Sequence, residues 1–243
     1  MPYVPQQADV SFLLEAVLGA PAQLRSLPPF AEADDSIWQQ VLDGAGAFVA
    51  EVVAPLQAVG DAPGCRFEAG RVTTPPGFAD AYQAFWQGGW PSLACAPEDG
   101  GQGLPFVVNT LFYEMLNSAN QAWTMYPGLS HGAYAALEAH GTPEQKSTYL
   151  PKMTSGEWTG TMCLTEPHCG TDLGLMRTKA EPQADGTYKS TGNKIFISAG
   201  EHDMAENIIH LVLARLPDAP PGIKGISLFI VPKFHVNKDG SVG

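Results

Sequence analysis

The residues that could do chemistry are concentrated in the segment 159–172, where an apolar run ends in a polar turn. Its first six residues are typical of a buried strand, and Pro167 ends the run because proline cannot donate to a neighbouring strand. The turn contains Gly170 and carries the hydroxyls of Thr165 and Thr171. Successive backbone N–H groups in such a turn suit an anion or a polar ring edge. An ordinary strand-to-turn exit with a Pro–Gly stop would leave the same pattern.

Two other kinds of chemistry compete for this region. His168, Cys163 and Cys169 could be metal ligands, but zinc sites prefer closer pairs with a matching second pair, so we expect no metal. The cysteines, which also include Cys65 and Cys95, show no Cys-x-x-Cys spacing and are read as reduced thiols of a cytoplasmic protein.

Histidines offer a further candidate, an acid–base pair made from His202-Asp203 and His210. His210 lies inside an apolar run, which is typical of a strand. We therefore expect structural histidines rather than a catalytic pair.

Helical periodicity dominates the first two thirds of the chain. The expected helices are residues 9–17, 35–54, 77–87, 105–120, 129–140 and 143–151. Gly141 is expected to cap one helix in a left-handed conformation, and Thr142 with Gln145 forms a capping box for the next. Residues 60–77, rich in Gly and Pro, are expected to cross the surface, and Pro127 and Gly128 leave the shape of 120–130 open.

The period changes after Trp158. Short runs rich in β-branched residues predict strands at 192–198, 207–214 and 225–231, and Asp185-Gly186 predicts a hairpin. Helices followed by strands, rather than alternating with them, predict an α+β fold.

Charge and composition exclude several classes of function. The 243-residue chain has a net charge of −12, with 5 Lys and Arg against 16 Asp and Glu in residues 1–158 and 8 against 9 in residues 159–243. Nucleic-acid binding requires clustered cations, so it is not expected, and a phosphorylated cofactor should bind mainly to the second region. No apolar run reaches the roughly 18 residues of a membrane span, and no secretory signal is visible.

Several motifs resemble one family in collinear order. Thr165-Glu166-Pro167 followed by Gly170-Thr171-Asp172 resembles the first signature of the acyl-CoA dehydrogenases. The segments 96–103, 140–157 and 192–200 resemble the family's glycine turn, the helix pair before its β-domain and its Gly-x-Lys-x-Trp-Ile-Thr-Asn-Gly strand. The match covers residues 35–235. The N-terminal stretch and the loop 200–203 resemble the larger bacterial members, including those acting on methylthiopropionyl-CoA.

The resemblance implies that residues 1–243 contain three parts of the family's fold and lack a fourth. Residues 1–34 would be an N-terminal extension, 35–158 an all-α helical bundle, and 159–243 an incomplete antiparallel β-barrel or sandwich. A C-terminal helical domain would lie outside these residues.

The resemblance also implies a set of contacts with FAD. Met162, Leu164 and Thr165 would meet the pyrimidine edge of the flavin. Gly170 and Thr171 would bind its pyrophosphate, and Thr171 would also lie beside the pantetheine arm of the substrate. Two positions depart from the family pattern while keeping an aromatic face and a hydroxyl: Phe196 replaces the tryptophan that covers the flavin, and Ser198 replaces a threonine near N5.

The reaction implied is α,β-desaturation of an acyl-CoA thioester, with hydride transfer to flavin N5. The glutamate that acts as base in the family has no match in residues 1–243, and Glu166 and Glu114 are not assigned its role, so this piece alone is expected to be inactive. The expected partners are an acyl-CoA, electron-transfer flavoprotein as acceptor, and further copies of the full-length chain. A non-catalytic flavin- or acyl-CoA-binding scaffold and an acyl-CoA oxidase are the alternatives.

Overall fold

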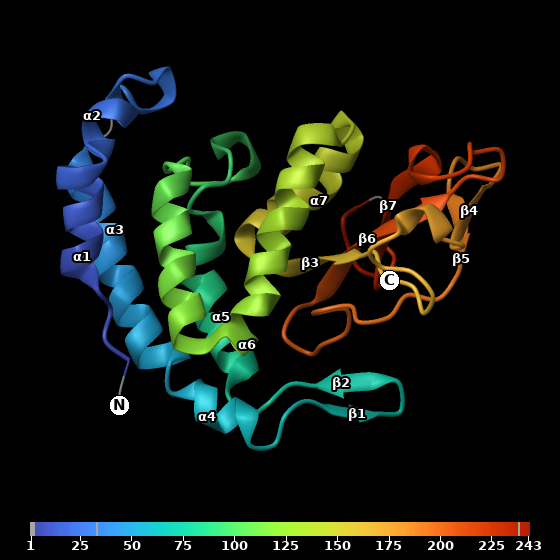
Figure 1. Cartoon of the computed structure of the whole chain (residues 1–243), viewed down its shortest axis with the longest axis horizontal. Coiled ribbons are helices and arrows are strands. Elements are labelled where there is room, and N and C mark those ends of the chain that lie inside the picture. The colour runs from blue at the N-terminus through green and yellow to red at the C-terminus, as the bar shows by residue number, and fades with distance from the viewer. Residues whose placement is uncertain (1–2, 33, 238) are drawn as a thin grey trace.

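Helices come first and a mixed sheet follows them in the computed structural model, which describes residues 3–32, 34–237 and 239–243 (Figure 1). The helices are α1 (Gln7–Phe12), α2 (Ala20–Arg25), α3 (Asp35–Phe48), α4 (Leu56–Asp61), α5 (Phe78–Gln87), α6 (Phe106–His140) and α7 (Pro143–Ser155). The strands are β1 (Arg66–Glu68), β2 (Arg71–Thr73), β3 (Trp158–Cys163), β4 (Lys179–Pro182), β5 (Tyr188–Thr191), β6 (Asn207–Arg215) and β7 (Ile226–Pro232). The α+β class is confirmed.

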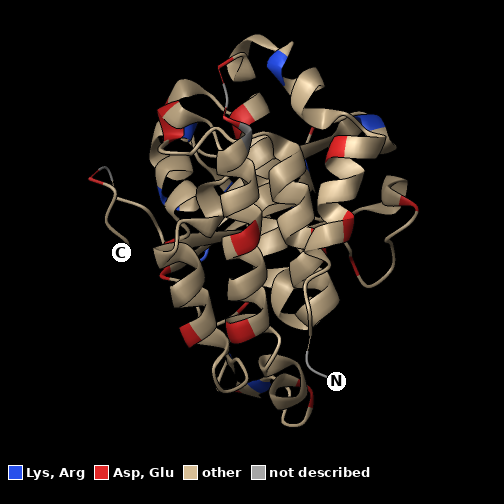
Figure 2. Cartoon of the chain, turned by 90° about the vertical axis from the view of Figure 1, so that its left-hand side faces the viewer, with Lys and Arg blue, Asp and Glu red and all other residues tan. Residues whose placement is uncertain are grey.

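The core of the helical part is formed by the apolar stripes of α3, α5 and α6. Leu42 and Ala45 of α3 lie at helical spacing and are buried, as the periodicity predicts. Phe85 of α5 stacks on Phe112 of α6 with ring centroids 6.1 Å apart, and Trp123 packs edge-on against Phe85. Figure 2 looks onto the helical side and shows acidic residues outnumbering basic ones on the ribbon.

α6 is a hairpin of two helical arms rather than one rod. Asn120 is non-helical (φ −159°, ψ 85°), and the ring of Phe106 in the first arm stacks 5.4 Å from that of His131 in the second. The Asn120 Oδ1 accepts a hydrogen bond from the Trp123 N–H (3.1 Å), so Asn120 caps the second arm. The sequence predicts two helices here, at 105–120 and 129–140, and the structure differs in that the second arm begins directly after Asn120 and runs through Pro127.

The junction between α6 and α7 differs from the prediction in one respect. The capping box is confirmed, because Thr142 and Gln145 exchange side-chain and backbone hydrogen bonds. The left-handed cap at Gly141 is wrong: its backbone is extended (φ −68°, ψ 151°) because it leads directly into the next helix cap. α7 continues through Pro151 and ends at Ser155, and its C-terminal cap Gly156 has φ +91°.

The sheet contains both parallel and antiparallel pairs, which corrects the expectation of an antiparallel barrel or sandwich. β3 pairs with β6 in parallel from Trp158 to Cys163, whereas β6–β7 and β4–β5 are antiparallel. The described strands do not close into a barrel. The hairpin predicted at Gly186 is confirmed between β4 and β5. No helix in the described ranges is long and apolar enough to cross a membrane.

One of the expected strands is wrong. Residues 192–198 are not a strand, because Phe196 (φ +55°) and Ala199 (φ +52°) turn the chain out of the extended conformation. Residues 60–77 lie largely on the surface, as expected, and contain the end of α4 and the exposed β1–β2 hairpin, for which the sequence gives no signal.

Candidate functional site

The candidate site lies where β3 leaves the sheet. The backbones of Glu166 and Cys169 exchange two hydrogen bonds (2.9 and 3.1 Å), which closes a tight turn and places Gly170 directly after it. A methyl group added to Gly170 would lie 3.5 Å from the Thr165 side chain, so these two residues are neighbours. On the strand itself Met162 is 41% exposed between two buried residues. The turn therefore brings Met162, Thr165 and Gly170 to one end of β3.

A buried ion pair supports this turn from behind. The carboxylate of Glu166 accepts hydrogen bonds from the backbone N–H groups of Arg177 (2.8 Å) and Thr178 (2.9 Å) and from Lys194 Nζ (3.0 Å). Lys194 Nζ also donates to the carbonyl of Leu164 (2.9 Å). Burial alone would raise the pKa of Glu166, but the hydrogen bonds outweigh it and lower the pKa to about 2. Lys194 is not among the site residues predicted from the sequence, where its only signal is its place in the 192–200 motif.

The segment after Lys194 returns to the end of β3. The Ile195 N–H donates to the carbonyl of Thr165 (3.0 Å), and the hydroxyl of Thr161 donates to the carbonyl of Ser198 (2.7 Å). Between these anchors Phe196 is 88% exposed in a left-handed conformation that non-glycine residues rarely adopt. These anchors hold the segment that contains Phe196 and Ser198 beside the exit of β3.

An open cleft of about 410 Å³ adjoins this arrangement. It is lined by Val72, Cys163, Lys194, Ile195, Phe196, Ile197, Gly200, Glu201 and His210. Val72 belongs to the unpredicted β1–β2 hairpin, so one wall of the cleft comes from the helical half of the chain and the rest from the sheet half.

Several polar groups at the strand exit are free to bind a ligand. Within the part of the chain that the structure describes, the hydroxyls of Thr165, Thr171 and Ser198 form no hydrogen bond. The same holds for the backbone N–H groups of Gly170 and Thr171 among the described residues. Free donors beside an exposed aromatic ring can hold an anion and the edge and face of a planar ring system.

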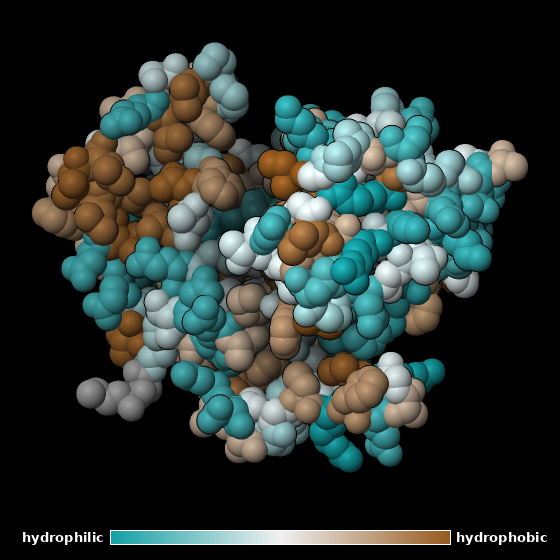
Figure 3. Space-filling model, turned by 45° about the vertical axis from the view of Figure 1, so that its right-hand side comes forward, coloured by the Kyte–Doolittle hydropathy of each residue, from teal (hydrophilic) through white to brown (hydrophobic). Residues whose placement is uncertain are grey.

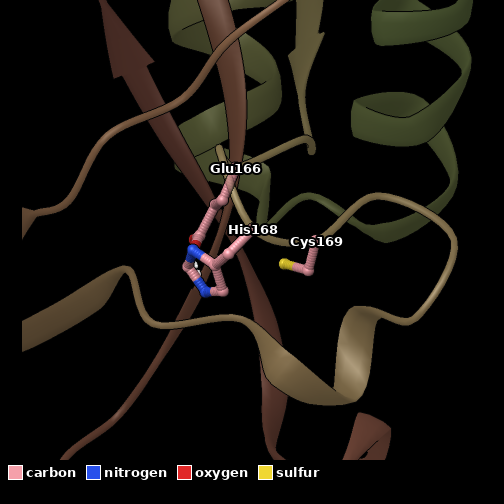
Figure 4. Close-up of side chains that lie close together, drawn as sticks. All are labelled: Glu166, His168 and Cys169. Carbon is pink, nitrogen blue, oxygen red and sulfur yellow. Dashed lines mark ion pairs between the residues drawn. The ribbon is translucent and has the colours of Figure 1, made fainter.

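Glu166, His168 and Cys169 lie close enough together to raise the question of a metal ion (Figure 4). The ring of His168 points toward Glu166, with Nε2 3.5 Å from its Oε2, and the same nitrogen lies 3.0 Å from the carbonyl of Leu175. Both carboxylate oxygens already accept donors, and one of these is the ammonium of Lys194, which would repel a cation. The group is better explained as part of the ion-paired turn.

The two histidines considered as an acid–base pair contact backbone groups instead. The ring nitrogens of His210 lie 2.7 Å from the carbonyl of Gly200 and 3.0 Å from that of Val231. His202 is buried, with Nδ1 accepting from the Met204 N–H (3.2 Å) and Nε2 facing the Thr159 hydroxyl (3.1 Å). Burial, and then the charge of Lys233, lower the pKa of His202 to about 4. Their predicted structural role is confirmed.

Comparisons with known proteins point to one family. The family model for the N-terminal domain of acyl-CoA dehydrogenases matches residues 38–157. The 3-methylmercaptopropionyl-CoA dehydrogenase of Ruegeria pomeroyi is 45% identical over 240 residues, which are 99% of this chain and 41% of that protein.

Solved structures agree with the sequence comparisons. Butyryl-CoA dehydrogenase from Megasphaera elsdenii superposes with a TM-score of 0.68 and 26% identity, covering 83% of this chain and 49% of that one. A structure described as the electron transferring flavoprotein of Acidaminococcus fermentans gives a TM-score of 0.66 and 26% identity, covering 81% and 47%. The chain thus spans less than half the length of these proteins.

Proposed function

The chain belongs to the acyl-CoA dehydrogenase family, and we propose that the protein is an FAD-dependent enzyme that desaturates an acyl-CoA between its α- and β-carbons. Because the chain spans only 41% of the Ruegeria relative, the proposal concerns the whole protein. We also propose that the base glutamate of the reaction lies outside residues 1–243.

The observation that carries the proposal is the group of free donors beside an exposed aromatic ring at the end of β3. The backbone N–H groups of Gly170 and Thr171 would hold the pyrophosphate of FAD, with the Thr171 hydroxyl also beside the pantetheine arm. Thr165, Met162 and Leu164 would meet the edge of the flavin. Phe196 would cover its face and Ser198 would lie near N5. Bound FAD would supply the hydride acceptor.

Glu166 is ionised, and its surroundings suit a structural role in the site rather than proton abstraction. A general base works best when its pKa lies near the working pH, and the pKa of Glu166 is about 2. Its lone pairs are also occupied by two backbone N–H groups and by Lys194. Glu166 therefore fixes the turn that presents the Gly170 and Thr171 donors.

We infer a short acyl chain, because the relatives described above are named for 3-methylmercaptopropionyl-CoA and butyryl-CoA. Electron-transfer flavoprotein is the proposed acceptor, in line with the similarity to the Acidaminococcus structure. The proposed location is the cytoplasm.

The test uses the purified full-length protein. It should show a flavin absorbance spectrum that bleaches anaerobically on addition of butyryl-CoA or 3-methylmercaptopropionyl-CoA. A colourless protein that cannot be reconstituted with FAD would overturn the proposal. Flavin that binds but is never bleached by an acyl-CoA would instead support a scaffold, and rapid reoxidation of the reduced flavin in air would indicate an oxidase.

A further inference from the structure

One arginine at the end of β6 joins two loops through their backbone carbonyls. Arg215 donates from Nε to Met176 (3.0 Å) and from Nη2 to Gly174 (3.0 Å). On the other loop, Nη2 donates to Gly222 (2.7 Å) and Nη1 to Pro220 (3.2 Å). The guanidinium thus serves four acceptors with a group that has five N–H donors. Among the described residues Arg215 forms no ion pair with a carboxylate, so its positive charge faces only carbonyl dipoles.

The first of these loops is continuous with the turn that carries the free donors. Gly174 and Met176 follow Gly170 and Thr171 closely, and the Asp172 carboxylate accepts from the Gly174 N–H (3.0 Å), which links the two parts. At its far end, residues 177–178 donate to the buried Glu166 carboxylate. The segment 170–178 is therefore held by an anion through its N–H groups and by a cation through its carbonyls.

We propose that Arg215 is a positioning residue for the cofactor: it fixes the segment 170–176 on the end of β6 so that the N–H groups of Gly170 and Thr171 face the FAD pyrophosphate. This inference rests on the proposed function. The N–H groups of Gly170 and Thr171 form no hydrogen bond with other described residues, so the anchors on either side decide where they point. The charge of Arg215 also places a cation in this part of a chain whose net charge is −12.

The geometry requires arginine in particular. A guanidinium is a planar fork with donors in fixed directions, whereas a lysine ammonium is a compact point charge. The substitution Arg215→Lys would keep the charge. The three N–H donors of an ammonium group lie on a single nitrogen atom, however, so they could not reach carbonyls on two loops at once. This conservative variant therefore separates the clamp from the charge.

The experiment compares FAD affinity in the full-length protein and in Arg215→Lys, Arg215→Ala and Arg177→Ala. Arg177 is a matched control, because it lies in the same segment and only its backbone is bonded to described residues. We expect both Arg215 variants to raise the FAD dissociation constant at least about tenfold, because charge-assisted hydrogen bonds are lost. Arg177→Ala should change it less than about twofold.

A second readout does not depend on the cofactor. In the apo protein, amide hydrogen exchange of residues 170–178 should accelerate in Arg215→Lys, while exchange in the β3–β6 ladder stays unchanged. Wild-type affinity and exchange in Arg215→Lys would overturn the inference, and so would an equal loss of FAD in Arg177→Ala, which would show an effect of net charge alone. If the wild-type protein binds no FAD, the proposed function fails, while the exchange measurement still tests the clamp.

Discussion

At the scale of single residues, Glu166 is the buried charge on which the strand exit depends. Its pKa of about 2 lies below the ordinary value of 4.5, so its ionised form stabilises the fold at pH above about 4.5. This contribution, on the order of 3 kcal/mol in the free energy of unfolding, is lost as the pH falls from about 4.5 through about 2.

The substitution Glu166→Gln tests this contribution. It leaves the largely buried Lys194 ammonium without its partner, so we expect a loss of about 2–4 kcal/mol at pH 7. The stability of the variant should also depend less on pH below about 4.5. Urea unfolding at several pH values measures both effects, and an unchanged acid dependence would show that another group is responsible.

The sequence predicts which residues lie at the site, but it does not predict the contacts that hold them there. Thr165, Gly170 and Thr171 lie at the strand exit as expected, because proline and glycine end a strand locally. The role of Lys194 could not be predicted, since it binds Glu166 across a separation of 28 residues. The orientation of Phe196 depends on a positive φ angle that no local pattern signals.

At the scale of elements, β3 depends on Gly160 for its packing against the helices. A methyl group there would lie 2.5 Å from the Ala133 side chain and 2.9 Å from that of Met153. We expect Gly160→Ala to lower the free energy of unfolding by about 1–3 kcal/mol through overpacking. Gly132→Ala is the matched control: it has open space inside a helical arm, so it should stabilise by about 0.5–1 kcal/mol. Thermal unfolding measures both, and equal effects would refute the packing argument.

The loop 200–206 connects the sheet to the helical part through hydrogen bonds and a ring contact. Asp203 Oδ1 accepts from both the N–H and the hydroxyl of Thr74 (3.1 and 2.7 Å), and His202 packs edge-on against Tyr126 (5.3 Å). His202 is buried in its neutral form, with the proton assigned to Nε2 by the hydrogen bond at Nδ1.

Because His202 is buried in its neutral form, we expect a second pH range in which the stability of the fold changes. Its pKa in the folded protein is about 4, below the ordinary 6.5, so its contribution is complete above about pH 6.5 and is lost as the pH falls toward 4. The loss should reach about 3 kcal/mol. His202→Gln should flatten this part of the profile in denaturant unfolding between pH 7 and pH 4.5. A slope that survives the substitution would contradict the assignment.

Periodicity predicts whether most segments are helices or strands, but it does not predict which strands pair with each other. The helices of the first part were found from apolar spacing because that signal is local. The parallel pairing of β3 with β6 joins segments about 50 residues apart, and nothing in either run specifies direction. Residues 192–198 look like a strand because they contain the run from Ile195 to Ile197, yet the Ile195 N–H bonds to the carbonyl of Thr165 rather than to a neighbouring strand.

At the scale of the whole molecule, apolar side chains are exposed on the N-terminal helices, where Figure 3 shows a brown area at the upper left. Phe12, Leu13, Val17 and Leu18 are each about half exposed. Exposed apolar patches favour association, so we expect the 243-residue chain to associate with increasing concentration. Sedimentation analysis measures this, and a monodisperse monomer that melts cooperatively would contradict it.

The central claim is that the exit of β3 holds FAD through its free donors, and FAD affinity in the full-length protein tests it most directly. Each hydroxyl bonded to the cofactor should contribute about 0.5–1.5 kcal/mol. The double variant Thr165→Val/Thr171→Val should therefore raise the FAD dissociation constant roughly 5- to 150-fold. Thr148→Val, an exposed helix position with a local hydrogen bond, serves as the control and should not change it. Unchanged yellow colour and unchanged FAD retention in the double variant would contradict the account.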